Sequence, residues 1–239
     1  LAHFAYPSRP VTLVTDAPPG GPLDFLARLI ASVLDTMLGQ RLVVENKAGA
    51  ARNLAADYVA QSKPDGYTVL FDIDTTFTVN PHLYRKMTFR PDALKPVMIL
   101  ASSGLMIGVN PKTGIKTMGE LVKAAKARTL NFSSGGIGSP GHLVMAEFDQ
   151  VTQTKFNHIP YGGNTPAVAA IVSGEVDGGV LATAGRLPYV RDGKSTALAV
   201  TSAQRSRLAP TVPTVKEAGY KDLQQEVLFV AMLPAATPG

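Results

Sequence analysis

A proline- and glycine-rich turn separates a strand-like segment from a helix-like one near the start of the chain. Residues 11–15 are rich in β-branched side chains, which favours a strand, and apolar residues recur at helical spacing from Leu26 to Met37. The turn between them, residues 17–24, reads APPGGPLD. Its glycines leave backbone N–H groups free and the helix adds its positive dipole end, so the turn favours an anion. The ordinary alternative is a helix start with Pro22 near its first position.

A second loop of the same kind lies in the other half of the chain. Residues 130–134 favour a strand, residues 135–141 form a glycine-rich loop, and a helix-like segment begins at His142. Two loops that each lead into a helix N-terminus could face each other across a cleft and hold one anionic ligand. His142 stands in the first turn of its helix, so we expect it to have a polar role there.

Composition excludes several classes of protein. The chain has 239 residues, of which 45% are hydrophobic and 17% charged, as is typical of a globular protein. Its net charge of +5 comes from scattered basic residues, so we expect no nucleic-acid partner. The absence of cysteine excludes disulfides, cysteine-based zinc sites and cysteine nucleophiles. No apolar run approaches the ~20 residues that span a bilayer. Residues 1–5 could be the stub left by signal-peptide cleavage or an arbitrary start.

Strand and helix signals alternate along the chain, which predicts an α/β protein with mainly parallel sheets and helices on both faces. Such folds bind ligands beyond the carboxyl ends of their strands, where both glycine loops fall. The strand-like segments are 11–15, 42–44, 67–71, 97–101, 130–134 and 197–200, and the helix-like segments are 26–37, 52–61, 118–126, 165–172 and the one that begins at His142.

Motifs for catalysis and cofactors are weak. Residues 136–141 match G-x-G-x-x-G, but no carboxylate follows about twenty positions on, and Pro140 interrupts the motif. The four histidines lack metal-ligand spacing, and no nucleophile, base and orienting group can be assembled. We therefore expect no catalytic residue, no metal and no cofactor, and favour binding without chemistry. A cytoplasmic nucleotide-dependent enzyme that uses Gly136–Gly141 is the alternative from another class.

Several segments together resemble one family, the Bug-type extracytoplasmic solute receptors of tripartite tricarboxylate transporters. The resemblance runs from Tyr6 to the C-terminus, in order and at the family's spacing. The segments are 6–10 (YPSRP), 18–24 (PPGGPLD), 43–50 (VVENKAGA), 64–68 (PDGYT), 80–84 (NPHLY), 159–163 (IPYGG), 198–202 (LAVTS), 212–215 (VPTV) and 217–219 (EAG).

The resemblance implies a two-lobed periplasmic binding protein of the Venus-flytrap, type II-like kind, in which each lobe is a sheet flanked by helices. Lobe I would comprise residues 1–101 and 226–239, with its C-terminal part truncated, and lobe II residues 102–225. Such a receptor is a periplasmic monomer whose signal peptide has been removed. It closes around a small organic acid and delivers it to the membrane components of the transporter. A related sensor subunit, which reports occupancy to a signalling partner, is a further alternative.

The residues that would contact the ligand follow from the family's two loops, the end of its third strand and one further position in lobe II. They are Ala17, Pro19, Gly20, Gly21, Asp24, Asp74, Thr75, Thr76, Ser133, Ser134, Gly135, Gly138, Ser139, His142 and Leu181. Asp16 and Ala17 stand where the family usually has a proline and an aromatic residue, Leu228 where it often has tryptophan, and Leu181 where it often has an acidic or hydroxyl side chain. Smaller side chains at Ala17 and Leu228 would reshape the pocket.

Acidic residues near the first loop suggest a particular ligand chemistry. Asp16, Asp72 and Asp74 bring negative charge to the same rim. Asp72 and Asp74 alternate along a strand end, so only one faces the ligand, and Asp74 aligns with the family's usual hydroxyl. We therefore expect a ligand that pairs a carboxylate with an amino, ring-nitrogen or hydroxyl donor. The alternative is that Asp74 is a solvent-exposed loop residue.

Overall fold

The computed structural model describes residues 6–238, which belong to two compact units. The first unit is Leu1–Ala101 with Leu228–Gly239, and the second is Ser102–Val227. The resemblance places the lobe boundaries at 101/102 and 225/226, so the units and the expected lobes differ by residues 226–227. No helix in the described part of the chain is both long and apolar enough to cross a membrane.

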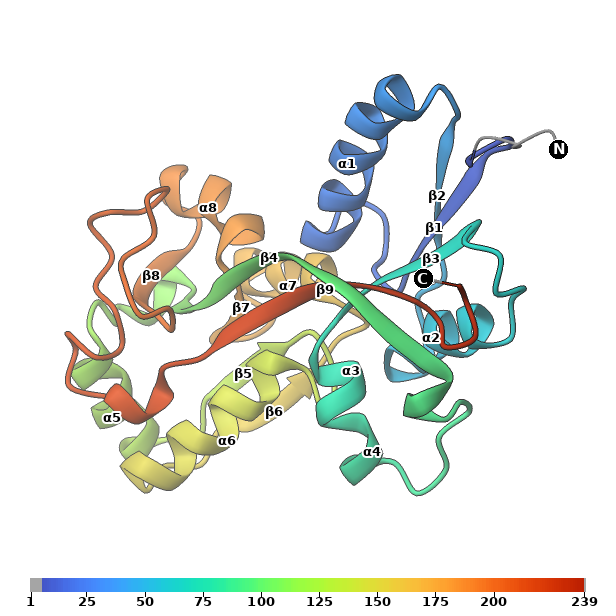
Figure 1. Cartoon of the computed structure of the whole chain (residues 1–239). Coiled ribbons are helices and arrows are strands. Elements are labelled where there is room, and N and C mark those ends of the chain that lie inside the picture. Colours follow the sequence, from blue (N-terminus) through green and yellow to red (C-terminus); the bar gives the residue numbers. More distant parts are fainter. Residues whose placement is uncertain (1–5, 239) are drawn as a thin grey trace, which may run out of the picture. The chain divides into compact units, whose positions relative to one another are not determined.

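The first unit is a sheet in the strand order β2-β1-β3-β9 (Figure 1). Strand β1 is parallel to both β2 and β3, whereas β9 is antiparallel to β3. The elements of this unit are β1 (Val11–Thr15), α1 (Pro22–Leu38), β2 (Leu42–Asn46), the 3-10 helix η1 (Ala50–Arg52), α2 (Asn53–Ala60), β3 (Thr68–Ile73), α3 (Thr75–Thr78), α4 (Asn80–Leu83) and η2 (Pro91–Ala93), with the start of β4 (Leu94–Val109) and the end of β9 (Glu226–Pro234).

The core of the first unit forms where α2 covers β1 and β3. Val14 and Leu70 from these strands are fully buried against Ala55 and Val59 of α2. Each buried aliphatic side chain of this size contributes roughly 1.5–3 kcal/mol, so the cluster anchors the strands whose carboxyl ends lead into the first loop.

Helix α1 confirms the predicted element but differs in the face that it buries. Pro22 occupies its first turn, and Gly39 ends it in the left-handed conformation at φ 65°. The buried positions are Leu23, Asp24 and the small residues Ala27 and Ala31. The apolar positions that we expected to face the core instead include Leu29, Val33 and Met37, which are exposed.

The second unit is a mixed sheet in the order β4-β7-β5-β6, with β8 also paired to β4 (Figure 1). Strand β5 is parallel to β6 and β7, whereas β4 is antiparallel to β7 and β8. The elements are the end of β4, η3 (Pro111–Thr113), α5 (Met118–Ala127), β5 (Asn131–Ser134), α6 (Pro140–Thr152), β6 (Asn157–Pro160), α7 (Asn164–Ser173), β7 (Gly178–Ala182), α8 (Thr183–Arg191), β8 (Thr196–Val200), η4 (Lys221–Leu223) and the start of β9.

The expectation of mainly parallel sheets is therefore only partly right. The strands that follow the βα alternation are parallel, and each unit adds antiparallel pairs through β4 or β9. The chain passes from the first unit to the second within β4 and returns within β9. No crossover helix among the described residues precedes either strand to make it parallel to its neighbour.

Candidate functional site

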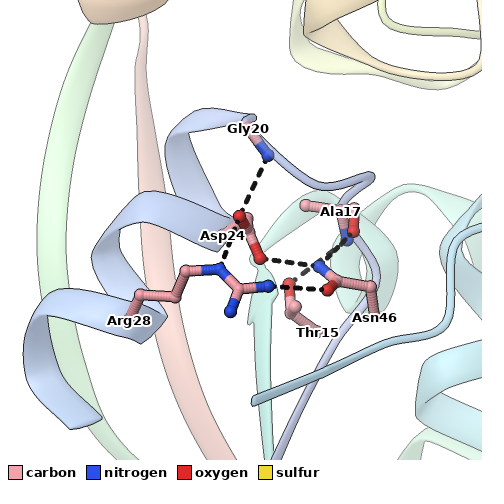
Figure 2. A network of polar contacts seen from close by, with 6 residues as sticks. All are labelled: Thr15, Ala17, Gly20, Asp24, Arg28 and Asn46. Carbon is pink, nitrogen blue, oxygen red and sulfur yellow. Dashed lines mark hydrogen bonds and ion pairs between the residues drawn. The ribbon is translucent and has the colours of Figure 1, made fainter. Parts of the chain in front are cut away.

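The first loop is organised around the carboxylate of Asp24 (Figure 2). The Gly20 N–H donates to Asp24 Oδ2 at 2.9 Å, and Asn46 Nδ2 donates to Asp24 Oδ1 at 2.8 Å. Arg28 Nε donates to Oδ2 at 3.0 Å from one turn further along α1. Asn46 Nδ2 also donates to the Ala17 carbonyl at 2.9 Å, which ties the end of β2 to the start of the turn.

These contacts make Asp24 a positioning residue for the turn. Burial raises its pKa, but the hydrogen bonds from Arg28, Asn46 and Gly20 outweigh burial and lower the pKa overall, so the side chain is ionised at neutral pH. Both carboxylate oxygens are occupied within the chain. Our prediction that Asp24 contacts the ligand remains untested, whereas its place at the first loop is as expected.

The glycine amides of the first loop are engaged within the loop. Gly20 donates to Asp24, and Gly21 donates to the Pro18 carbonyl at 3.2 Å. Pro22 has no N–H group, and the first hydrogen bond within the helix is the one that the Phe25 N–H donates to the Gly21 carbonyl. The N–H groups of Leu23 and Asp24, in the first turn of α1, are therefore the ones left for an anion. Gly20 adopts φ 81°, which glycine favours, whereas Gly21 adopts φ −77°, so Gly21 has no need of the left-handed region.

The other two expected ligand residues of the first loop are Ala17 and Pro19. Pro19 is exposed and Ala17 is half-buried, next to the buried Asp16. The Ala17 N–H donates to Thr15 Oγ1 at 3.2 Å, which fixes the turn against the end of β1.

Asp16 and Asp72 form a buried acidic pair with one arginine. Arg52 Nε donates to Asp16 Oδ2 at 2.8 Å, and Thr76 Oγ1 donates to Asp72 Oδ1 at 2.8 Å. Burial raises the pKa of Asp16 to about 6 against the opposing charge of Arg52. Burial, followed by the charge of Asp16, raises the pKa of Asp72 well above its usual range.

Asp74 differs from Asp72 in its surroundings. It is half-buried, and its Oδ1 accepts from the Leu228 N–H at 3.3 Å, while its own N–H donates to the Leu228 carbonyl at 3.0 Å. Burial raises the pKa of Asp74 despite these contacts. Asp74 thus fastens α3 to β9, and Asp72, two positions earlier, is the fully buried acid. Thr75 and Thr76, which follow, are both buried.

The second loop begins at the end of β5 and leads into α6. Ser139 caps the helix, since its Oγ accepts from the His142 N–H at 3.3 Å. The Gly138 N–H donates to His142 Nδ1 at 3.1 Å, so His142 holds the loop in shape. Gly135 is half-buried beside them.

Gly141, the last glycine of residues 136–141, is required by packing. A Cβ at Gly141 would lie 2.1 Å from the Val180 carbonyl oxygen, so α6 approaches β7 too closely for any side chain at that position. The Gly138 N–H already donates to His142. These two roles within the chain account for Gly138 and Gly141 of the G-x-G-x-x-G match without a bound dinucleotide.

A pair of stacked histidines underlies the second loop. The rings of His142 and His158 are 4.2 Å apart at 9°. Ser134 Oγ lies 2.6 Å from His158 Nε2, which connects β5 to β6. Burial and then the neighbouring His142 lower the pKa of His158 to about 4, and burial lowers that of His142. Sequence reasoning missed His158, although its position in the strand that follows α6 could have indicated it.

Two other expected ligand residues have core positions. Ser133 is buried, and its Oγ donates to the carbonyls of Ala167 at 3.2 Å and Gly178 at 3.3 Å. Leu181 is buried in an apolar cluster with Val168 and Ile171 of α7. Ser133 therefore bonds α7 and β7, and Leu181 belongs to the core of the second unit.

The described residues hold no group of three or more His, Asp and Glu side chains able to bind a metal ion. The chemistry that both loops offer is hydrogen bonding to an anion from helix N-termini and a capping hydroxyl.

Comparisons with known proteins agree with one another. The family described as "Tripartite tricarboxylate transporter family receptor" matches residues 26–239. Protein BugT of Bordetella pertussis is 34% identical over 236 residues, covering 97% of this chain and 72% of BugT. An R. palustris protein solved with adipate gives a TM-score of 0.94 at 31% identity, covering 98% of this chain and 79% of that one. MatC from Rhodopseudomonas palustris, solved with bound malate, gives 0.90 at 30% identity, covering 98% and 80%.

Proposed function

Because this chain belongs to the tripartite tricarboxylate transporter receptor family, we propose that it captures a small organic carboxylate for delivery to such a transporter. One observation carries the proposal. The hydrogen bonds of Asp24 hold the turn that precedes α1, and the helix begins directly after that turn, at Pro22. The N-terminus of a helix binds carboxylates through unpaired N–H groups and its dipole. Two relatives have been solved with adipate and malate, both carboxylates, which supports the same class of solute.

Each unit has its own candidate anion-binding loop in this proposal. In the first unit the N–H groups of Leu23 and Asp24 receive a carboxylate. In the second unit the corresponding groups are the Gly141 N–H at the start of α6 and the Ser139 hydroxyl. Ser134 and His142 shape this second loop through their contacts with His158 and Gly138.

The remaining parts of the proposal follow from the family. The two compact units correspond to the two lobes of a Venus-flytrap receptor. The receptor acts in the periplasm as a monomer, without catalysis or a cofactor, and presents the loaded solute to the membrane components of the transporter.

The test is calorimetric titration of the chain with succinate, malate, glutarate and adipate, in the wild type and two matched variants. Gly20 and Gly114 both have positive φ, at 81° and 72°, and a Cβ at either would meet no atom within 4 Å. Alanine at each site introduces the same backbone strain, so both variants should be destabilised by about 1 kcal/mol. Only Gly20→Ala should weaken binding, because only Gly20 lies in the turn before α1.

Two results would contradict the proposal. Absence of binding for every carboxylate would refute the solute class. Equal affinities in Gly20→Ala and Gly114→Ala would show that the first loop has no part in binding.

A further inference from the structure

Two carboxylates lie at the ends of neighbouring strands in the first unit. Strand β1 pairs with β3 so that Thr15 lies beside Phe71, and Asp16 and Asp72 are the next residues along the two strands. Asp72 is completely buried and Asp16 is 6% exposed. The pair therefore lies at the carboxyl edge of parallel strands, which is where α/β folds bind their ligands.

One oxygen of each carboxylate lacks a hydrogen bond. Arg52 occupies Asp16 Oδ2, and Thr76 occupies Asp72 Oδ1. Asp16 Oδ1 and Asp72 Oδ2 have no hydrogen-bond partner in the part of the chain that the structure describes, and the same holds for Thr75 Oγ1. Buried polar atoms are paired in the great majority of cases, so the two unpaired carboxylate oxygens of this coupled pair call for a donor from outside the chain.

The pair also lacks a counter-charge. Arg52, from η1, is the cation that acts on both Asp16 and Asp72, and it balances one of the two negative charges. A second buried charge without a partner is strongly disfavoured, so the pair requires one more unit of positive charge.

We propose that the Asp16–Asp72 pair is the subsite for a protonated nitrogen of the solute. The inference rests on the proposed function: the start of α1, a few residues along the chain from Asp16, takes the carboxylate, and the pair takes an amino group of the same molecule. An ammonium group carries N–H donors and one positive charge, which suit the two unpaired carboxylate oxygens and the missing charge. The solute is thus an amino-substituted dicarboxylate.

A proton takes the place of the ammonium group when the receptor is empty. Burial raises the pKa of Asp16 to about 6, and burial together with the charge of Asp16 raises the pKa of Asp72 well above its usual range. The charge of Arg52 lowers the pKa of both carboxyl groups, but both pKa values stay above the ordinary value of an aspartate. The pair therefore keeps a proton to a higher pH than an ordinary aspartate does, and an ammonium group that binds there favours release of that proton.

The test compares acids that differ only by one amino group. We would titrate succinate against aspartate, glutarate against glutamate, and adipate against 2-aminoadipate by calorimetry at pH 7. In the wild type at least one amino acid should bind about tenfold or more tightly than its plain counterpart, the value expected for hydrogen bonds to a charged group. Titration in phosphate and in Tris buffer should show proton release for that amino acid and none for the plain acid.

Two variants separate the pair from the rest of the chain. Asp72→Asn keeps the shape of the side chain and can donate to Asp16 Oδ1, so it should remain folded and still bind the plain acid. The ratio between amino and plain acid should fall to about one or below, because the hydrogen bonds to the charged carboxylate are lost. Asp92→Asn, at an exposed acid paired with Arg90, should leave the ratio unchanged.

The outcomes distinguish this inference from the proposed function. Plain acids that bind as tightly as their amino counterparts in the wild type would overturn the subsite while leaving the carboxylate receptor intact. The same conclusion follows if Asp72→Asn preserves the ratio, or if the preferred amino acid releases no proton. Absence of binding for all six acids would refute the proposed function and this inference with it.

Discussion

Replacing Asp24 with asparagine should loosen the turn before α1. Three donors point at the carboxylate: the Gly20 N–H and Arg28 Nε at Oδ2, and Asn46 Nδ2 at Oδ1. An amide of the same shape presents one oxygen and one NH2 group. Whichever way the amide turns, at least one of these donors meets another donor.

The size of the effect follows from which contact is lost. A hydrogen bond to a charged group contributes about 1.5–3 kcal/mol. The Arg28 contact counts for less, because its side chain is 53% exposed, and exposed ion pairs contribute about 0–1 kcal/mol. We therefore expect Asp24→Asn to lower the free energy of unfolding by about 2 kcal/mol at pH 7.

The effect should also depend on pH with a definite sign. The pKa of Asp24 is lowered in the folded chain, because the hydrogen bonds outweigh burial. The stabilisation is therefore present above the pKa of the unfolded state and is lost as the pH falls through the lowered folded value. The difference between wild type and Asp24→Asn should shrink at acid pH.

Urea unfolding measures the stability, and calorimetric titration with malate and adipate measures the solute affinity. Asp92→Asn is the control, since Asp92 and Arg90 form an exposed pair, and a change there should stay within about 0.5 kcal/mol. Solute affinity should fall in Asp24→Asn and stay constant in the control. An unfolding free energy for Asp24→Asn that matches the control, together with unchanged affinity, would refute the positioning role of Asp24.

Two further changes test the second unit. Gly141→Ala should lower the free energy of unfolding by about 1–3 kcal/mol, because its Cβ would lie 2.1 Å from the Val180 carbonyl oxygen; a melting temperature equal to that of the wild type would contradict this packing. The pKa of His158 is lowered to about 4, so the unfolded chain binds more protons than the folded chain between pH 6.5 and 4, and stability should fall as the pH falls through that window. His158→Gln should flatten this part of the urea-midpoint profile, and an unchanged slope would assign the pH dependence to other groups.

Local signals in the sequence were sufficient for the elements that surround the first loop. The β-branched run of β1 and Pro22 in the first turn of α1 each act within a few residues, and the structure bears out both; Gly39, which ends α1, is a local signal of the same kind. The contacts that shape the loop are of another kind. Asn46 reaches Asp24 across 22 positions, and no periodicity within one element indicates such a contact.

The second unit shows where pattern reasoning fails. Strand β7 begins with Gly178 and Gly179, residues that argue against a strand. They are required there because a Cβ at Gly178 would lie 2.6 Å from the Gly108 carbonyl oxygen, and one at Gly179 would lie 2.4 Å from Ser133 Oγ. The hydrogen bonds of Ser133 to the carbonyls of Ala167 and Gly178 likewise join residues that are distant in the sequence, so no local pattern indicates them.

The order of the two units along the chain affects how the protein folds during synthesis. The second unit is one continuous segment, whereas the sheet of the first unit is completed only when β9 pairs with β3, with Leu70 beside Met232. During synthesis β3 therefore presents an open edge until the last strand emerges, and open edges invite pairing with other chains. The second unit should thus mature first on the ribosome, and nascent chains halted before residue 228 should depend on chaperones that shield the edge of β3.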